Sequence, residues 1–439
     1  MLLEFQVENY LSFKEKATLS MIASPSINKN ELKNSMFCIN GIRILKSAAI
    51  FGANASGKSN FIKAIDFMVD FISNSAKEST FGKKIRVENF KLSEETINQP
   101  TALEITFLVK NPTPYSSKEY IEFRYGFQIN KYKVESEWLF ARFTKIESTL
   151  FTRFGDHIKI FEKFKEGKQI YKTIGNINKT TLFLSLIANI KGENAPITNM
   201  VMNWFTNLRD ITPIANDNFA IITADLMKNK QVKNEILKAL ALADMCIEDI
   251  IVNKKKLDFN QLPEDMKQEI NKKKLADLFS IKLKTLHSKY NSKKQSVGKV
   301  SFDFKDEESD GTKKFFAIIG PILSALNNGL VLVIDEIDTR LHPNLCSFLI
   351  SMFNSKRINR KNAQLIFASH NTLIMNRKIL RRDQIYLVEK DKYGASELYS
   401  LLDYKKVRND ASYNKDYLMG KYGAVPFLGN FESLFNKEG

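Results

Sequence analysis

The stretch Ile50–Ser59, which reads IFGANASGKS, constrains the fold of this chain more than any other. It fits the pattern G-x-x-x-x-G-K-[S/T], with Gly52 and Gly57 at the glycine positions and Lys58-Ser59 at the end. The glycines let a loop turn tightly and point its N–H groups at an anion, the lysine supplies a positive charge, and the serine offers a hydroxyl to Mg²⁺. The stretch therefore predicts a phosphate-binding loop.

The residues on either side supply the context that such a loop needs. Residues 44–51 form a short, mostly apolar run typical of a strand, and residues 60–72 carry apolar side chains at helical spacing. A helix that begins at the loop adds the positive end of its dipole to an anion site. The predicted nucleotide contacts are Gly52, Ala53, Asn54, Ala55, Ser56, Gly57, Lys58, Ser59 and Asn60.

A second run, Leu330–Ile334, reads LVLVI and is apolar at every position, as is typical of a parallel strand covered on both faces. Asp335 and Glu336 follow it directly. With a phosphate loop upstream, Asp335 is predicted to hold Mg²⁺ through water, together with Ser59, and Glu336 to polarise the attacking water. This acidic pair therefore predicts Mg²⁺-dependent hydrolysis of a nucleotide.

Two further polar positions are candidates for the same site. Ser309-Asp310-Gly311 precedes a predicted helix, residues 313–327, whose N-terminus would offer unpaired N–H donors to an anion. An ordinary helix N-cap is the alternative, and the spacing alone favours it. His370 follows an apolar strand, residues 364–368, and could donate a hydrogen bond to a γ-phosphate, although a lone histidine is more often structural.

The remaining elements follow from the periodicity of apolar residues. Alternating runs in the N-terminal third predict an antiparallel sheet, whereas the middle of the chain carries helical spacing. The predicted strands are 2–8, 17–22, 101–109, 119–129, 135–143, 158–161, 299–304 and 384–388, and the predicted middle helices are 180–190, 199–208 and 234–245. The chain shows no internal repeat and no sustained heptads, so we expect no coiled-coil arm.

These elements predict an α/β fold in which a parallel core sheet lies beside an antiparallel sheet. Residues 1–165 are expected to form the N-terminal part of this head and residues 296–439 its C-terminal part. Residues 166–295 are expected to form a mainly helical, lysine-rich insertion. The turn-rich stretch 417–428 is expected to pack on the head.

The charge of the chain favours an anionic partner. The chain has 66 basic and 49 acidic residues and a net charge of +17, and nucleic acid is the usual partner of such a protein. Lysines cluster at 254–256 and at 272–274, where they would contact phosphates or form a solvated surface. A lysine-rich soluble protein without such a partner is equally compatible with this charge.

The composition also bears on the compartment. The three cysteines lie far apart and form no C-x-x-C pair, so neither disulfides nor a zinc site are indicated: Cys38, Cys246 and Cys346. No apolar run reaches the roughly 18–20 residues of a membrane span, and the N-terminus lacks a signal-peptide layout. We therefore expect a cytoplasmic protein. His157 and His287 have no metal-ligand companion at useful spacing and are interpreted as structural, although a nuclease within residues 150–300 stays open.

Taken in order, these motifs resemble the ATPase head of the ABC class. Within that class the chain is similar to the SMC and RecF branch and, more closely, to bacterial AAA-type ATPases of the OLD and abortive-infection group, such as the AbiLi and PARIS AriA types. The blocks that carry the resemblance are FQVENYLSF, ESDGTKK, IDEIDTRLHP and YLMGKYGAVP. It covers residues 1–75 and 298–428, is loose between them, and implies an ABC-type P-loop ATPase head.

The resemblance implies a role for each matching position. Gly52–Ser59 would be the Walker A motif, and Asp335 with Glu336 would be the Walker B motif with its catalytic base. The cofactors implied are ATP and Mg²⁺. The glutamine of the Q-loop has no secure position, and Gln99 and Gln128 are both open candidates.

The same resemblance implies a dimer, or a higher homo-oligomer, in which two heads enclose two ATP molecules. Ser309 and Gly311 would contact the γ-phosphate of ATP held by the opposite subunit. Asp338 would lie at the dimer-facing D-loop position, and His370 would be the switch histidine. The signature reads ESDGT and not the transporter form LSGGQ, which argues against a transporter subunit.

Two classes of function follow from the resemblance. The favoured one is an ATP-driven sensor or switch in anti-phage defence by abortive infection. About fifty residues follow Val388, too few for a built-in Toprim nuclease, so we expect a separate effector, a nuclease or a toxin. The alternative is a RecF- or SMC-like repair ATPase that clamps on DNA. DNA or RNA is a further expected partner, and a membrane is not.

Overall fold

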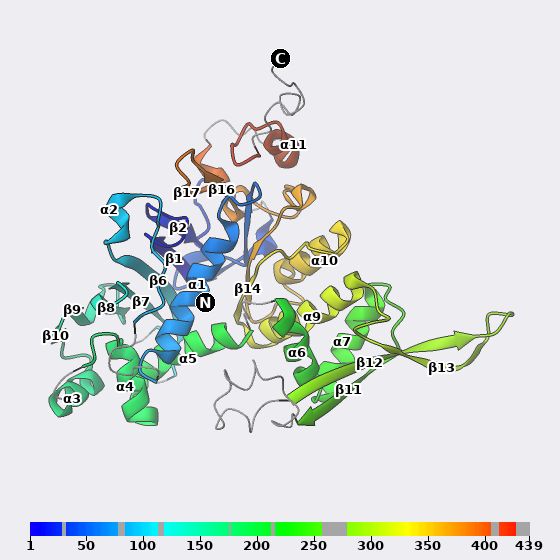
Figure 1. Cartoon of the computed structure of the whole chain (residues 1–439), viewed down its shortest axis with the longest axis horizontal. Coiled ribbons are helices and arrows are strands. Elements are labelled where there is room, and N and C mark those ends of the chain that lie inside the picture. The colour runs from blue at the N-terminus through cyan, green and yellow to red at the C-terminus, as the bar shows by residue number, and fades with distance from the viewer. Residues whose placement is uncertain are drawn as a thin grey trace, which may run out of the picture. The chain divides into compact units, whose positions relative to one another are not determined.

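The computed structural model describes residues 1–28, 32–77, 84–112, 118–174, 177–211, 216–256, 279–404 and 412–426. The chain divides into two compact units, whose elements are labelled in Figure 1. The first comprises Met1–Thr212, Ala325–Asp338 and Cys346–Gly439, and the second comprises Pro213–Ser324 and Thr339–Leu345. None of the described helices is long and apolar enough to cross a membrane.

One sheet of the first unit carries the predicted phosphate loop. Its strands lie in the order β14 (Val331–Ile334), β15 (Gln364–Ala368), β5 (Ser47–Gly52), β16 (Ile385–Lys390) and β17 (Ser396–Ser400). The first four strands are parallel, and β17 is antiparallel to β16. Every residue of β14, β15 and β5 is buried, which explains their nearly continuous apolar sequence. The predicted parallel core sheet is confirmed.

A second sheet of this unit is antiparallel and has the strand order β10-β9-β8-β7-β6-β1-β2. Its strands are β1 (Leu2–Glu8), β2 (Ala17–Ser20), β6 (Thr101–Lys110), β7 (Tyr120–Ile129), β8 (Val134–Arg142), β9 (Ser148–Phe154) and β10 (His157–Ile160). Burial alternates along most of β6, as its sequence pattern predicted. Strand β9 was not predicted, because the buried Arg153 interrupts its apolar pattern. The α/β class is confirmed.

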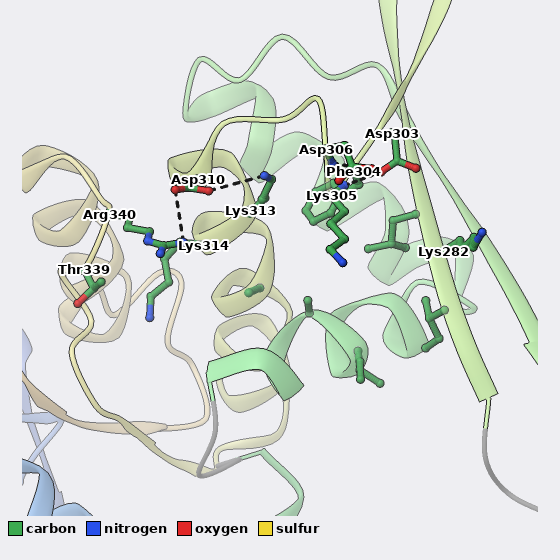
Figure 2. A pocket seen from close by; sticks show the side chains of 15 residues that line it. Lys282, Asp303, Phe304, Lys305, Asp306, Asp310, Lys313, Lys314, Thr339 and Arg340 are labelled. Atoms are coloured by element: carbon green, nitrogen blue, oxygen red, sulfur yellow. Dashed lines mark hydrogen bonds and ion pairs between the residues drawn. The ribbon is translucent and has the colours of Figure 1, made fainter. Parts of the chain in front are cut away.

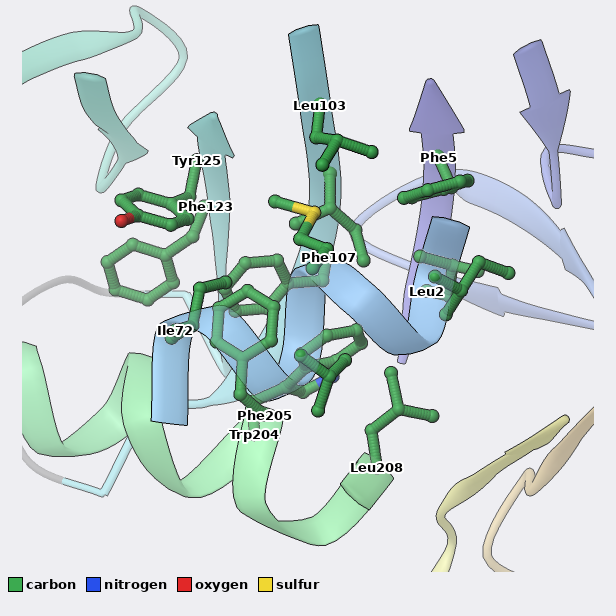
Figure 3. Packing of buried hydrophobic residues seen from close by; sticks show 14 of the residues in the cluster. Leu2, Phe5, Ile72, Leu103, Phe107, Phe123, Tyr125, Trp204, Phe205 and Leu208 are labelled. Carbon is green, nitrogen blue, oxygen red and sulfur yellow. The ribbon is translucent and has the colours of Figure 1, made fainter. Parts of the chain in front are cut away.

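Helix α1 (Lys58–Asn74) contacts both sheets, through β1 on one side and β5 and β15 on the other. Its Phe61 ring meets Phe5 of β1 edge to face, with the ring centroids 5.4 Å apart. Trp204 of α5 (Pro196–Ile211) stacks on Phe107 of β6 at 4.3 Å, as part of the aromatic core in Figure 3. Buried rings therefore join α1 to β1 and α5 to β6.

Smaller elements complete the first unit. They are β3 (Met36–Ile39), β4 (Ile42–Leu45), α2 (Glu94–Ile97), α3 (Lys165–Thr173), α4 (Phe183–Lys191), α11 (Tyr413–Leu418) and most of α10 (Pro343–Asn354). Short 3₁₀ helices span Lys33–Ser35, Gly192–Asn194, Thr372–Ile374, Arg382–Gln384 and Leu401–Asp403. The hydroxyls of Tyr399 and Tyr404 donate to the Tyr422 carbonyl at 2.8 and 2.7 Å. The described part of the stretch 417–428 thus packs on β17, as expected.

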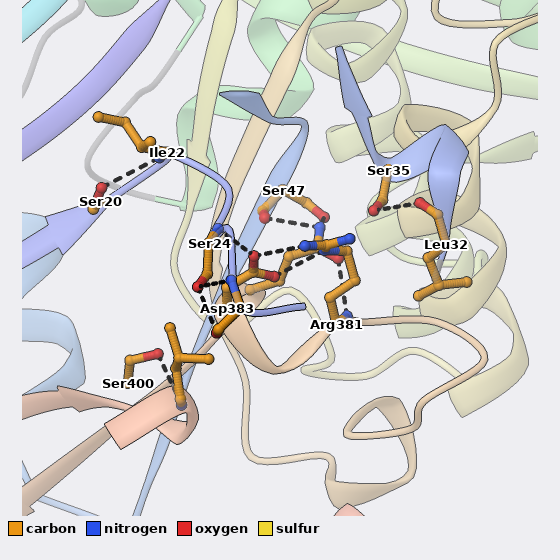
Figure 4. A network of polar contacts seen from close by, with 12 residues as sticks. Ser20, Ile22, Ser24, Leu32, Ser35, Ser47, Arg381, Asp383 and Ser400 are labelled. Atoms are coloured by element: carbon orange, nitrogen blue, oxygen red, sulfur yellow. Dashed lines mark hydrogen bonds and ion pairs between the residues drawn. The ribbon is translucent and has the colours of Figure 1, made fainter. Parts of the chain in front are cut away.

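A buried polar network anchors the start of β5. The Arg381 guanidinium donates to both oxygens of Asp383, from Nε at 2.9 Å and Nη2 at 2.8 Å, and both residues are buried. Asp383 also accepts from the Ser24 N–H at 2.8 Å, as Figure 4 shows. The Gln384 amide donates to the Ser47 carbonyl at 3.0 Å. The buried charges are paired with each other, and the neighbouring Gln384 ties this segment to the start of β5.

The second unit combines helices with a small sheet. Its helices are α6 (Asn216–Leu226), α7 (Lys230–Leu242) and α9 (Asp310–Asn328), which runs on into the first unit. An antiparallel sheet, β11 (Asp249–Lys256), β12 (Phe279–Tyr290) and β13 (Ser296–Asp303), completes it. Strands β11 and β12 were not predicted, because their lysines suggested a solvated surface rather than a strand.

The compact units do not coincide with the predicted boundaries at residues 166 and 295. Helices α3 to α5 belong to the first unit, since α5 packs on α1 and on the antiparallel sheet. The lysine cluster at 254–256 lies at the end of β11, and the cluster at 272–274 lies outside the described residues.

The two histidines of the middle region occupy different settings. His287 Nε2 lies 2.7 Å from Glu308 Oε1, and its ring packs on Phe302 with centroids 4.6 Å apart. These contacts tie β12 to β13 and to the residues before α9, which supports the structural interpretation of His287. His157 lies exposed in β10.

Candidate nucleotide-binding site

The predicted site residues of the first unit follow the carboxyl ends of neighbouring parallel strands. Ile50 of β5 pairs with Ala368 of β15, and Phe367 pairs with Ile334 of β14. The Ser369 N–H donates to the Ile50 carbonyl at 3.0 Å. The loop after β5, the acidic pair after β14 and the residues after β15 therefore meet at one edge of the sheet, where α/β proteins bind their ligands.

The two motif glycines cannot be replaced by larger residues, because other atoms lie where a Cβ would be. A Cβ at Gly52 would clash with the Val388 carbonyl of β16. Gly57 has φ +119°, and a Cβ there would clash with the Ser396 hydroxyl and lie 2.8 Å from Ser12 Oγ. The loop is thus packed too tightly at both positions for any larger residue.

Two serines support the loop and were not predicted. Ser396 Oγ, at the start of β17, donates to the Ser56 carbonyl at 2.5 Å, and the Ser396 N–H donates to the Ser12 carbonyl at 2.7 Å. Ser12 Oγ accepts from the Asn60 amide at 2.8 Å. Ser12 lies within the FQVENYLSF block, but no spacing in the sequence links either serine to a loop so distant along the chain.

Lys58 is 4% exposed and lies inside the loop. Its ammonium donates to the Gly52 carbonyl at 2.9 Å and to the Ala53 carbonyl at 2.8 Å. Burial lowers the pKa of Lys58, and the negative charges of Asp335, Glu336 and Asp338 oppose this effect. The cation and the three carboxylates are therefore near neighbours at the same sheet edge.

The acidic pair shows two features typical of a ligand site. Asp335 Oδ1 is buried and has no hydrogen-bond partner among the described residues, and the same is true of Ser56 Oγ in the loop. Glu336 has φ +49°, a backbone conformation that is costly for a residue other than glycine and that concentrates at functional sites. The unpaired Asp335 oxygen fits a hydrated cation, because an unsatisfied buried carboxylate oxygen is otherwise destabilising.

The side chain of Asp338 is hydrogen-bonded to the backbone of His370. The His370 N–H donates to the Asp338 carboxylate, with 3.2 Å to Oδ2 and 3.3 Å to Oδ1. The His370 side chain is exposed. The imidazole is therefore presented to solvent from a fixed backbone position.

Ser309 and Gly311 lie in the second unit, at the start of α9. Ser309 Oγ accepts from the Thr312 N–H at 3.1 Å, which is the N-cap contact that the spacing favoured. Asp310 pairs with Lys313 at 3.6 Å and with Arg340 at 3.4 Å, as Figure 2 shows. These residues border a cavity of about 830 Å³, whose lining includes basic side chains from β12, from α9 and from the turn between β13 and α9.

A glycine-rich loop at the carboxyl edge of a buried parallel sheet, followed by a helix and flanked by an acidic pair, defines a P-loop nucleotide-binding protein. Residues 47–376 match the family described as "AAA domain, putative AbiEii toxin, Type IV TA system", and the chain belongs to that family. It is accordingly an AAA-type ATPase. No curated protein matches the chain.

Among solved structures, the chain is similar to two SMC heads and to a recombination mediator. The SMC head domain from Thermotoga maritima has 13% identity and a TM-score of 0.38, with 91% of this chain and 98% of that chain covered. The SMC head bound to the C-winged helix domain of ScpA has 16% identity and a TM-score of 0.35, with 91% and 97% covered. RecF with ATP has 14% identity and a TM-score of 0.34, with 91% and 99% covered.

Proposed function

We propose that this protein is an ATP-hydrolysing molecular switch that controls a separate effector in an anti-phage, abortive-infection system. The proposal of ATP hydrolysis rests on one observation. A buried oxygen of Asp335 has no hydrogen-bond partner among the described residues, and it lies beside Glu336 and close to Lys58 of the phosphate loop. A site that holds an unsatisfied carboxylate next to a buried ammonium suits a ligand that carries both phosphate and metal.

The loop would bind the triphosphate. Its backbone N–H groups and the N-terminus of α1 would face the phosphate oxygens, and Lys58 would exchange its two loop carbonyls for them. Ser59 and Asp335 would hold Mg²⁺, which neutralises charge on the phosphate oxygens. Ser12 and Ser396 would stabilise the loop conformation through their hydrogen bonds to Asn60 and Ser56.

Glu336 would orient the attacking water. Its φ of +49° sets the backbone geometry from which the carboxylate would reach the water. His370 would reach the γ-phosphate from the next strand end, with its backbone position set by Asp338. The reaction class is phosphoryl transfer to water, with the chain supplying position and charge.

A second copy would complete the site. By the resemblance, Ser309 and Gly311 at the start of α9 would contact the γ-phosphate on the opposite subunit, and Asp338 would face the dimer interface. Binding of ATP would then favour the joined heads and hydrolysis the separated ones. The Ser309 hydroxyl would have to leave its N-cap contact with Thr312, or share it, to reach a phosphate.

The biological role rests on the family and on the resemblance. The family description names a toxin and a toxin–antitoxin system, and the motif blocks resemble the OLD and abortive-infection ATPases, including the AbiLi and PARIS AriA types. Both favour a chain that works with a second component in cytoplasmic defence. A RecF- or SMC-like DNA clamp is the second candidate, favoured by the net charge of +17.

The test is ATP turnover and affinity copurification from the native host with Glu336→Gln, wild type and the control Glu162→Gln, an exposed carboxylate on another surface. Glu336→Gln should abolish turnover and retain bound ATP, whereas Glu162→Gln should match wild type. A second protein retained or released with the trapped state supports the switch. Duplex DNA trapped alone supports the clamp, and wild-type turnover in Glu336→Gln contradicts the assignment of the base.

A further inference from the structure

The hairpin of β12 and β13 extends beyond the strand that flanks it. Strand β11 pairs with β12 only as far as Asp249 opposite Leu286. Beyond that point, His287 to Tyr290 of β12 pair only with Ser296 to Val300 of β13, around a turn closed by the Asn291 N–H and the Gln295 carbonyl at 3.0 Å. We call residues 287–300 the arm; Figure 1 shows its two strands running on past β11.

The outer part of the arm has no buried face. Every side chain from Lys289 to Ser301 is exposed, including Tyr290 at 61% and Val297 at 57%. A two-stranded ribbon without a packed face is marginally stable in water.

The charge of the arm is of one sign. It contains four lysines, Lys289, Lys293, Lys294 and Lys299, and no aspartate or glutamate. Lys299 pairs with Glu248 at 2.7 Å. The other three lysines form no ion pair with any residue that the structure describes, so the arm offers three uncompensated positive charges to a polyanion.

The basic groups are distributed around the ribbon. Lys289 lies opposite Gly298, and Ser288 lies opposite Lys299. Because paired residues share a face and faces alternate along a strand, Lys289 and Lys299 lie on opposite faces. Lys293 and Lys294 occupy the turn. Because Glu248 compensates Lys299, the uncompensated charge lies on the face of Lys289 and at the tip. A narrow ribbon charged in this way can enter a groove between two phosphate walls.

We propose that the arm binds duplex DNA by entering the major groove, with the lysines on the flanking phosphates and Tyr290 toward the bases. The major groove of B-form DNA is about 12 Å wide and admits a two-stranded ribbon, whereas that of A-form RNA is deep and narrow. A second copy of the chain is disfavoured as occupant by its net charge of +17. The proposal goes beyond the ATP-driven switch and uses residues outside the nucleotide site.

The experiment is fluorescence anisotropy of the full-length protein with labelled duplex DNA, the matching single strand, duplex RNA of the same sequence, and poly-glutamate, over a series of salt concentrations. Wild type should bind duplex DNA most tightly. The triple variant Lys289→Ala/Lys293→Ala/Lys294→Ala should weaken binding. It should also reduce the slope of log K against log salt by about 0.9 for each phosphate that the variant no longer neutralises.

Two variants control for charge in general and for folding. Lys131→Ala/Lys165→Ala/Lys172→Ala removes the same charge from exposed positions of the first unit and should bind almost as wild type. Lys289→Arg/Lys293→Arg/Lys294→Arg keeps the charge and should retain the affinity. ATP turnover should be unchanged in all three variants, so a failure to bind DNA and a failure of the proposed ATPase are separate results.

Several outcomes would overturn the proposal. Failure of the protein to bind duplex DNA at low salt would contradict it, and so would a control triple that weakens binding as much as the arm triple. Equal affinity for poly-glutamate would show that the arm is an unspecific polyanion surface or binds an acidic protein. Tighter binding to single strands or to duplex RNA would rule out the groove geometry.

Discussion

The backbone N–H of His370 donates to the carboxylate of Asp338, 3.2 Å from Oδ2, and so joins the residues after β15 to those after β14. Asp338→Ala should release this link, displace His370 and lower ATP turnover by up to about a hundredfold, the cost of a misplaced catalytic group. Asp338→Asn keeps an acceptor and should retain more activity. Steady-state ATP hydrolysis measures both.

The control for this prediction is Asp391→Ala. Asp391 also accepts two backbone N–H groups, those of Tyr393 and Ala395, in the exposed turn between β16 and β17. It should leave turnover unchanged. Equal activity in Asp338→Ala and wild type would show that the link does not position His370.

Gly57→Ala should abolish nucleotide binding. The new Cβ would clash with Ser396 and Ser12, and φ +119° is strained for any residue other than glycine. Gly41→Ala is the matched control, because Gly41 has φ +82° but nothing within 4 Å of its Cβ position. Gly41→Ala should lower stability by about 1–2 kcal/mol and bind ATP normally. Calorimetry of ATP binding and thermal unfolding separate the two effects.

Ser396→Ala should weaken ATP binding more than it slows hydrolysis at saturation. The substitution removes the hydroxyl that donates to the Ser56 carbonyl. The loss of this hydrogen bond should destabilise the bound form of the loop by about 1 kcal/mol. We expect a KM several-fold higher and a nearly unchanged kcat. Ser400→Ala, which removes the cap of a 3₁₀ helix at the other end of β17, should leave KM unchanged; an equal rise there would mean a general loss of stability.

Arg153→Met should destabilise the fold by about 3–5 kcal/mol, because it removes the cationic partner of a buried carboxylate and the donors to the Gly155 and Thr181 carbonyls. Arg153 and Glu137 are 1% and 0% exposed, lie 3.8 Å apart, and connect β8 and β9. The double variant Glu137→Gln/Arg153→Met should be less destabilised than the sum of the single variants. Chemical denaturation measures the three free energies of unfolding, and strict additivity would contradict a coupled pair.

The carboxyl group of Glu137 should make the stability of the fold depend on pH. Burial raises the pKa of Glu137 in the folded protein, and the Arg153 charge opposes this. Between the pKa of the unfolded chain and the higher folded value, the native state binds the extra proton, so this contribution to stability falls as pH rises. Glu137→Gln should remove that decline from the unfolding free energy measured as a function of pH.

The central strands and the loop could be predicted because each has its pattern within a short stretch of sequence. Ile50–Ser59 carries its own turn glycines and precedes its own helix, and the apolar run before Asp335 identifies a buried strand by itself. Strands β11 and β12 could not be predicted, because lysines on an exposed face look like a solvated loop. Ser12 and Ser396 were missed since only the folded chain brings them to the loop.

The support that the loop receives from Ser12 and Ser396 has a consequence for synthesis and quality control. The loop is synthesised early in translation, but one residue that supports it, Ser396 of β17, is added more than three hundred residues later. A chain stalled or cut before that strand would carry an intact Walker A sequence without the contact that shapes it. Only chains that have completed their folding would then bind ATP, and truncated products would not.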